Sequence, residues 1–127
     1  MRPFSGEPIV RRYVQETERY YLVNFPANYE LWRDSITTLL IEAIEHMDKD
    51  VILDFGNIKK ADTSSIASFI RLLKMLKGRK FYACGISESL RALMDITMTE
   101  PIFRNNVKGY DVLEDILREN YGETRSK

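Results

Sequence analysis

Four residues that could cap a helix or accept a phosphate stand in a row: Asp62, Thr63, Ser64 and Ser65. Apolar residues spaced three and four apart follow them, which is the pattern of an amphipathic helix. At the start of a helix such side chains commonly accept hydrogen bonds from its first backbone N–H groups. A phosphate is also tolerated there, because a helix N-terminus favours negative charge by about 0.3–1 kcal/mol. The row therefore predicts a helix cap, or a cap beside a phosphorylated hydroxyl.

A second candidate phosphate acceptor is Asp54, which ends a short apolar run. A carboxylate in that place would resemble the acceptor of response-regulator receiver domains. Those domains also carry an acidic pair after their first strand, whereas here Pro26 and Ala27 follow the early strand-like segments. The residues favour a structural role, in which Asp54 accepts hydrogen bonds from backbone groups of residues 56–61.

The remaining reactive side chains are isolated. The chain has one histidine and one cysteine, so neither a His–carboxylate–nucleophile set nor a thiolate zinc site is indicated. We expect His46 on a helix surface and Cys84 as a small apolar residue in a buried strand. Gly56 and Gly78 are single glycines and form no phosphate-binding loop. The sequence thus predicts a protein without catalytic residues, metal or cofactor.

Basic residues flank the hydroxyl row. Lys59 and Lys60 precede it, and Arg71, Lys74 and Lys77 recur three apart on the outer side of the following segment. Two interpretations stay open: an ordinary solvated face, or an electropositive rim that meets an acidic surface of a partner protein. No aromatic residues are interleaved on that face, which gives no support to nucleic-acid binding.

Composition indicates one soluble globular domain. The chain has 127 residues, of which 44% are hydrophobic and 30% charged, as in ordinary globular proteins. Its 19 basic and 19 acidic side chains cancel, so no net field favours nucleic acid or an acidic membrane. No apolar stretch is long enough for a signal-peptide core or a membrane span. We expect a cytoplasmic protein that touches neither nucleic acid nor a membrane.

The spacing of apolar residues predicts strands that alternate with helices. Strands are predicted at residues 9–14, 20–25, 51–55, 81–86 and 102–103. Helices are predicted at residues 30–47 and 64–77, after Ser87, and after a capping box of Asp111 and Glu114. This alternation implies a largely parallel sheet with right-handed crossovers.

Residues 51–97 resemble the central part of a STAS domain, the module of anti-sigma factor antagonists and of sulphate-transporter tails. In that family an apolar strand with an acidic end is followed by a loop and by Asp-Ser-Ser-Gly-Leu-Gly at the start of a helix. The corresponding run here is Asp62, Thr63, Ser64, Ser65, Ile66 and Ala67. More weakly, the resemblance extends over residues 20–118.

The resemblance implies an α/β fold: an open mixed sheet of four to five strands with about four helices, packed mainly on one face. We expect one such domain at residues 9–120, a flexible leader at 1–8 and a frayed tail at 121–127. Two departures mark a divergent relative. Ser65 stands where the family has glycine, and residues 25–28 read Phe-Pro-Ala-Asn where relatives have Gly-x-hydrophobic-Asp.

What the resemblance implies for function is a bacterial protein-binding switch and not an enzyme. The family's phosphorylated hydroxyl corresponds to Thr63, with Ser64 as the alternative. The unphosphorylated form would bind an anti-sigma factor of the histidine-kinase-like ATPase type, which would phosphorylate it, and a PP2C-type phosphatase would reset it. The residues expected to meet the partner are Asp62, Thr63, Ser64, Ser65, Lys59 and Lys60.

Two alternatives stay open. The first is a STAS scaffold subunit that is never phosphorylated, in a stress-signalling or transporter-associated complex. The other alternative is a receiver-like domain that accepts phosphate on Asp54. Acid-stable phosphate on threonine would separate the first hypothesis from both alternatives.

Overall fold

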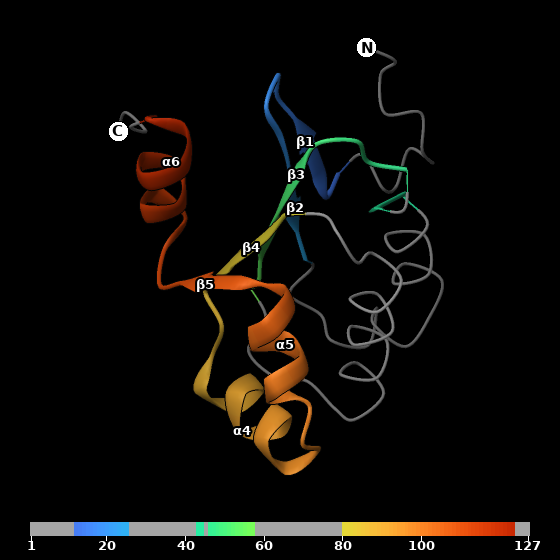
Figure 1. Ribbon diagram of the computed structural model, residues 1–127, viewed down its shortest axis with the longest axis vertical. Coiled ribbons are helices and arrows are strands. Elements are labelled where there is room, and N and C mark those ends of the chain that lie inside the picture. Colours follow the sequence, from blue (N-terminus) through green and yellow to red (C-terminus); the bar gives the residue numbers. More distant parts are fainter. Residues whose placement is uncertain (1–11, 26–42, 45, 58–79, 124–127) are drawn as a thin grey trace.

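Within the residues that the structure describes, five strands form one open sheet in the order β1-β2-β3-β4-β5 (Figure 1). They are β1 (Val14–Glu16), β2 (Tyr20–Asn24), β3 (Asp50–Asp54), β4 (Phe81–Cys84) and β5 (Lys108–Tyr110). Only β1 runs antiparallel to its neighbour β2, and the other three pairs are parallel. The predicted mixed α/β sheet is therefore confirmed.

The computed structural model describes residues 12–25, 43–44, 46–57 and 80–123. Within these residues lie three helices: α4 (Glu88–Ile96), α5 (Glu100–Asn106) and α6 (Leu113–Tyr121). Ala43 and Ile44 are helical too, at the end of the helix predicted for residues 30–47. The predicted leader, most of that helix, and the whole helix predicted at 64–77 lie outside the described residues.

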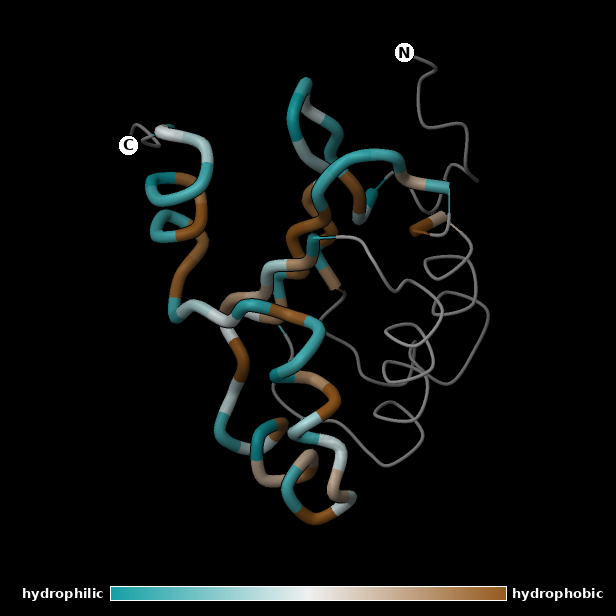
Figure 2. The backbone as a smooth tube through the Cα atoms, viewed as in Figure 1, coloured by the Kyte–Doolittle hydropathy of each residue, from teal (hydrophilic) through white to brown (hydrophobic). Residues whose placement is uncertain are grey.

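The three central strands are buried on both faces, as parallel strands usually are. Successive side chains of a strand point to opposite faces, and this divides the core in two. Tyr21, Val23, Val51, Leu53, Phe81 and Ala83 pack on one face with Ile44, Met47, Leu90, Met94 and Phe103. Tyr20, Leu22, Ile52, Tyr82 and Cys84 pack on the other face against Ile116, Leu117 and Tyr121 of α6. Hydrophobic stretches accordingly run through the strands and along α6 (Figure 2).

The first hairpin is tighter than predicted. Residues 12–13 form a turn and the strand spans Val14–Glu16, whereas the sequence predicted a strand at 9–14 and a loop from Gln15. The Thr17 hydroxyl explains the difference, because its Oγ1 accepts the backbone N–H groups of Arg19 and Tyr20 at 3.2 and 3.0 Å. This local hydrogen bonding closes the turn directly after the strand.

The predicted strand at Ile102–Phe103 is wrong, since both residues belong to α5. Pro101 is compatible with this helix because it lies in the first turn of α5, where backbone N–H groups have no hydrogen-bond partner within the helix. The capping box at Asp111 and Glu114 is also absent: the N-cap is Val112, without a side-chain hydrogen bond. The carbonyl of Asp111 instead accepts the N–H of Gly85 at 3.2 Å. This hydrogen bond continues the pairing of β5 with β4, so α6 begins only at Leu113.

Helix α4 ends in an unusual residue. Met98 adopts a left-handed conformation with φ of 59°, at the position after the C-cap Thr97 where helices usually have glycine. Its N–H donates to the carbonyl of Asp95, and the N–H of Thr99 donates to that of Met94, which is the Schellman pattern. A side chain in this conformation costs about 1–2 kcal/mol.

The burial pattern predicts very different effects for one substitution at two helical isoleucines. Ile116 in α6 is 0% exposed and Ile96 at the end of α4 is 76% exposed. Ile116→Ala should lower the free energy of unfolding by about 2–5 kcal/mol, because it leaves a cavity beneath α6. Ile96→Ala should change it by less than about 0.5 kcal/mol. Urea denaturation measures both, and equal losses would contradict the packing of α6 on the sheet.

Candidate functional site

All six residues that the sequence assigns to partner binding lie outside the described residues: Lys59, Lys60, Asp62, Thr63, Ser64 and Ser65. The structure does describe the point from which the chain runs toward them. Strand β3 ends at Asp54, and the exposed residues Gly56 and Asn57 follow at the carboxyl edge of the sheet. In open α/β sheets this edge is the usual place for binding sites.

Asp54 fixes the turn that leaves this edge. Its Oδ1 accepts the backbone N–H of Gly56 at 2.8 Å, and its carbonyl accepts the N–H of Phe25 at 3.2 Å. The first bond confirms the expected structural role of the carboxylate, which holds the turn in the manner of an Asx-turn. The second ties the end of β2 to the end of β3.

Two stacked aromatic rings hold the same edge from the other face. The ring centroids of Phe25 and Phe55 are 4.8 Å apart with an interplanar angle of 9°, and both side chains are buried. Each residue directly follows its strand. The stack, which is worth about 0.5–1.5 kcal/mol beyond its buried area, therefore fixes the relative position of the two strand ends.

A close backbone crossing between Gly85 and Gly56 also fixes the carboxyl edge of the sheet. Gly85 follows β4 with φ of 72°, and a Cβ placed on it would lie 2.7 Å from the Cα of Gly56 and 2.8 Å from its nitrogen. Only glycine fits such a place without a shift of the neighbouring backbone. Sequence reasoning missed Gly85; its one signal was a glycine directly after a buried strand.

Cys84 lies beside this crossing and is 2% exposed. Burial, and next the charge of the neighbouring Asp54 carboxylate, raise the pKa of its thiol to about 12. Since only the thiolate is a good nucleophile, the thiol is inert at neutral pH. The predicted role as an apolar residue of a buried strand is confirmed. His46 is exposed, as expected, but it lies in a turn after the helical residues Ala43 and Ile44 and not on a helix.

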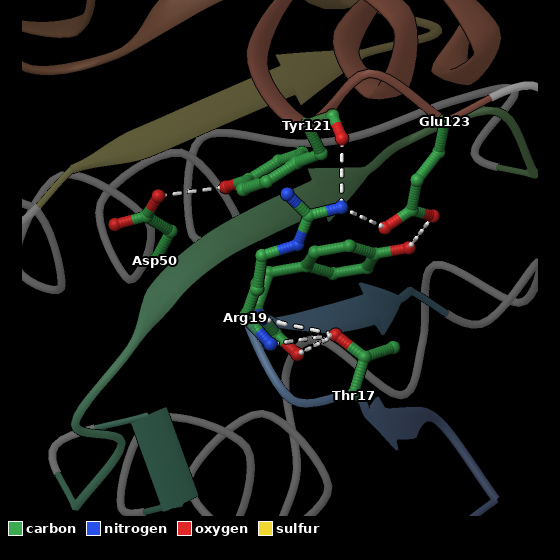
Figure 3. A network of polar contacts seen from close by, with 6 residues as sticks. Thr17, Arg19, Asp50, Tyr121 and Glu123 are labelled. Carbon is green, nitrogen blue, oxygen red and sulfur yellow. Dashed lines mark hydrogen bonds and ion pairs between the residues drawn. The ribbon is translucent and has the colours of Figure 1, made fainter.

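A separate polar network lies at the opposite, amino edge of β2 and β3 (Figure 3). The Tyr121 hydroxyl donates to Asp50 Oδ2 at 2.7 Å, while Arg19 Nη2 donates to the Tyr121 carbonyl at 2.7 Å and to Glu123 Oε2 at 3.1 Å. Tyr20 donates to Glu123 Oε1 at 3.1 Å. These contacts fasten the end of α6 to the hairpin.

The network falls partly where the sequence predicted a frayed tail at 121–127. Tyr121 is the last residue of α6 and is buried, and burial, together with the hydrogen bond to Asp50, raises the pKa of its phenol. Residues 124–127 lie outside the described residues. In the part of the chain that the structure covers, no three His, Cys, Asp or Glu side chains gather as metal ligands. No helix there is long and apolar enough to cross a membrane.

Comparison with known proteins gives one family and several similar structures. The family model described as STAS domain matches residues 24–116. A STAS domain protein of Planctomyces limnophilus, described as an anti-sigma factor antagonist, aligns over 82% of this chain and 92% of its own, with 18% identity and a TM-score of 0.64. No curated protein matches the sequence significantly.

Two further solved structures are similar. The anti-sigma factor antagonist SpoIIAA in its unphosphorylated form aligns over 88% of this chain and 97% of its own, with 14% identity and a TM-score of 0.57. A sulfate transporter family protein of Wolinella succinogenes aligns over 74% of this chain and 77% of its own, with 15% identity and a TM-score of 0.53. At these identities the likeness concerns the fold.

The glycine crossing predicts a ranked effect of alanine at three glycines. Gly85→Ala should cost about 2 kcal/mol or more, since it adds the left-handed penalty to a backbone clash. Gly122 also has a positive φ but open space around it, so Gly122→Ala should cost about 1–2 kcal/mol. Gly109 has open space and no positive φ, and Gly109→Ala should stay within about 0.5 kcal/mol. Equal values in urea denaturation would refute the crossing.

The raised thiol pKa predicts slow chemistry at Cys84. At pH 8 the native thiol should react with 5,5′-dithiobis(2-nitrobenzoate) at least about a hundredfold more slowly than in the unfolded chain. Because the folded pKa is raised from 9.0 to about 12, this group's stabilising contribution is complete below pH 9 and is lost as the pH rises toward 12. Equal native and unfolded reaction rates would mean that the thiol is exposed.

Proposed function

We propose that this chain, which belongs to the STAS domain family, binds a partner protein and that phosphorylation of Thr63 switches this binding. The observation that carries the proposal is the family match over residues 24–116, which includes the whole row from Asp62 to Ser65. The structural similarity to anti-sigma factor antagonists supports it, and one of these structures shows the antagonist in its unphosphorylated form.

The geometry of the carboxyl edge supports a binding role for the segment that follows it. Asp54, the Phe25–Phe55 stack and the Gly85–Gly56 crossing fix the strand ends from which residue 58 onward departs. Rigid support of this kind lowers the entropy that a binding segment loses when it meets a partner. The edge therefore suits a surface that recognises a protein.

The charge of a phosphate explains how a switch at Thr63 would operate. Phosphorylation adds about 1.5–2 negative charges at pH 7. At the start of a helix this charge is locally tolerated, so the fold should persist. At a partner interface the same charge must be desolvated, which opposes binding unless a cationic group meets it.

For the partner we propose an anti-sigma factor of the histidine-kinase-like ATPase type, which would also phosphorylate Thr63 or Ser64. A PP2C-type phosphatase would remove the phosphate, and all three proteins would act in the cytoplasm of a bacterium. Asp62 and Ser65 would complete the contact, and Lys59 and Lys60 would meet acidic groups of the partner. The domain itself would supply no catalytic residues and no cofactor.

One observation favours a second candidate, a STAS scaffold subunit that is never phosphorylated. The similar Wolinella succinogenes structure belongs to a sulfate transporter family protein, so the fold also occurs outside anti-sigma factor antagonists. A receiver-like function gains less support, because Oδ1 of Asp54 is held by the N–H of Gly56. Phosphate on threonine distinguishes the switch from both.

A negative charge at residue 63 should weaken partner binding, whereas removal of the Thr63 hydroxyl should leave the affinity unchanged. Thr63→Glu should weaken binding by about 2–4 kcal/mol, or roughly 30- to 1000-fold, because a buried charge at the interface lacks a mate. Thr63→Ala should bind at full affinity and lose at most about 1 kcal/mol of stability as a cap. Titration calorimetry with the purified anti-sigma factor, beside melting curves, measures both effects.

Thr63→Ser is the matched control, because it keeps a hydroxyl and should remain a substrate of the kinase. Ser64→Ala tests the neighbouring hydroxyl in the same assay. Wild-type affinity in Thr63→Glu, with unchanged stability, would remove Thr63 as the switch and favour the scaffold. Stoichiometric labelling of Asp54 by acetyl phosphate and magnesium would favour the receiver-like function.

A further inference from the structure

The backbone at the end of β3 is paired on both sides. The carbonyl of Asp54 accepts the N–H of Phe25, which follows β2, at 3.2 Å. The N–H of Phe55 donates to the carbonyl of Cys84, the last residue of β4, at 2.9 Å. These two bonds continue the pairing of β3 with its neighbours. The side chain of Asp54 therefore starts from a backbone that is held in place.

Gly56 follows this paired backbone and depends on contacts from outside for its conformation. It is exposed, and a glycine has more backbone conformations open to it than any other residue. Its one N–H donates to Asp54 Oδ1 at 2.8 Å. A Cβ on residue 56 would lie 3.0 Å from the same oxygen, so the missing side chain is what lets the carboxylate approach. The Asp54 carboxylate and the crossing with Gly85 thus set the direction in which the chain leaves the sheet.

The strength of the bond between Asp54 and Gly56 indicates what it can do. The bond is exposed and joins residues two apart, and such a bond favours its closed form by a factor of about 2–12. This factor is small beside folding equilibria of about a thousandfold or more. It is large enough to change the fraction of folded chains in which the turn is closed. The bond is therefore suited to positioning a segment and adds little to the stability of the domain.

We propose that Asp54 is a positioning residue for partner binding: through the N–H of Gly56, its carboxylate oxygen holds the start of the segment that leads to Thr63. This inference deepens the proposed function and rests on it. The apparent affinity of a binding segment scales with the fraction of the free chain that already has the competent conformation. Lys59 and Lys60 follow Gly56 most closely in sequence among the residues assigned to the partner, so they depend most directly on this turn.

The positioning role needs the acceptor oxygen of residue 54 and not its negative charge. Asparagine forms the same kind of turn as aspartate, because its side-chain carbonyl also accepts a backbone N–H two residues on. Asp54→Asn should therefore keep the role, whereas Asp54→Ala should lose it. A phosphate acceptor requires the carboxylate itself, so Asp54→Asn also separates positioning from the receiver-like alternative.

The matched control is Thr17→Val at the opposite, amino edge of the sheet. Thr17 Oγ1 also accepts a backbone N–H two residues on, that of Arg19 at 3.2 Å. Asp54→Ala and Thr17→Val in the full chain should each lower the melting temperature by about 2–8 °C. The two variants thus lose the same kind of bond, and only one of them loses it where the partner is proposed to bind.

Two measurements compare these variants with the wild type. Hydrogen exchange in the free chain reports on the turn itself: the Gly56 amide should exchange about 2–12-fold faster in Asp54→Ala. Titration calorimetry with a purified anti-sigma factor of the histidine-kinase-like type reports on binding, and the affinity of Asp54→Ala should fall by the same factor. Asp54→Asn and Thr17→Val should match the wild type in both measurements.

The outcomes separate the positioning role from the proposed function. Wild-type affinity in Asp54→Ala would overturn the role of Asp54 and leave partner binding intact. A loss of affinity without faster exchange at Gly56 would mean that Asp54 contacts the partner directly, which also overturns positioning. An equal loss of affinity in Thr17→Val would reduce the effect to stability, and an equal loss in Asp54→Asn would assign it to charge. No binding by the wild type would overturn the proposed function together with the role of Asp54 in it.

Discussion

The burial of β3 on both faces is the constraint on which the rest of the structure depends. Val51, Ile52 and Leu53 are fully buried, and their alternation sends neighbours to opposite faces. Each face therefore needs a cover of its own. On one face α4 and α5 supply part of that cover, with Ile44 and Met47, and on the other α6 packs on Ile52. Tyr121 and Arg19 then fasten the end of α6 to the amino edge of the sheet.

The carboxyl edge lies at the other end of the same strands. There, β2, β3 and β4 end side by side, and the backbone is fixed by Asp54 and the two crossing glycines. Contacts of Tyr121 and Arg19 stabilise the amino edge. The Asp54 turn, the Phe25–Phe55 stack and the glycine crossing fix the strand ends at the carboxyl edge. Under the proposed function, recognition would involve the segment that follows the carboxyl edge. Phosphate chemistry at such a segment need not disturb the core.

The sequence predicted most of the sheet, because continuous apolar runs such as those of β3 and β4 are characteristic of buried parallel strands. It also predicted the hydrogen bond at Asp54 and the burial of Cys84. It predicted a strand at residues 102–103 in place of α5, since a proline such as Pro101 is compatible with the first turn of a helix as well as with its end. The sequence did not predict that Tyr121 belongs to α6, because Tyr121 is held by Asp50 and Arg19, which are 71 and 102 residues away in sequence. Within the candidate site, a sequence motif identified the hydroxyl row. The role of Gly85 could not be predicted, because it depends on the packing of two backbone segments. Met98 likewise reveals its strain only through its backbone angle.

If phosphorylation of Thr63 is the proposed switch, phosphate on Thr63 and a bound partner exclude each other. The most direct measurement isolates the chain from its own cells in two pools, free and partner-bound, and maps phosphate in each by mass spectrometry. Phosphothreonine at residue 63 is expected in the free pool and should be nearly absent from the bound pool. Equal occupancy of Thr63 in the two pools, or phosphate in neither, would contradict it.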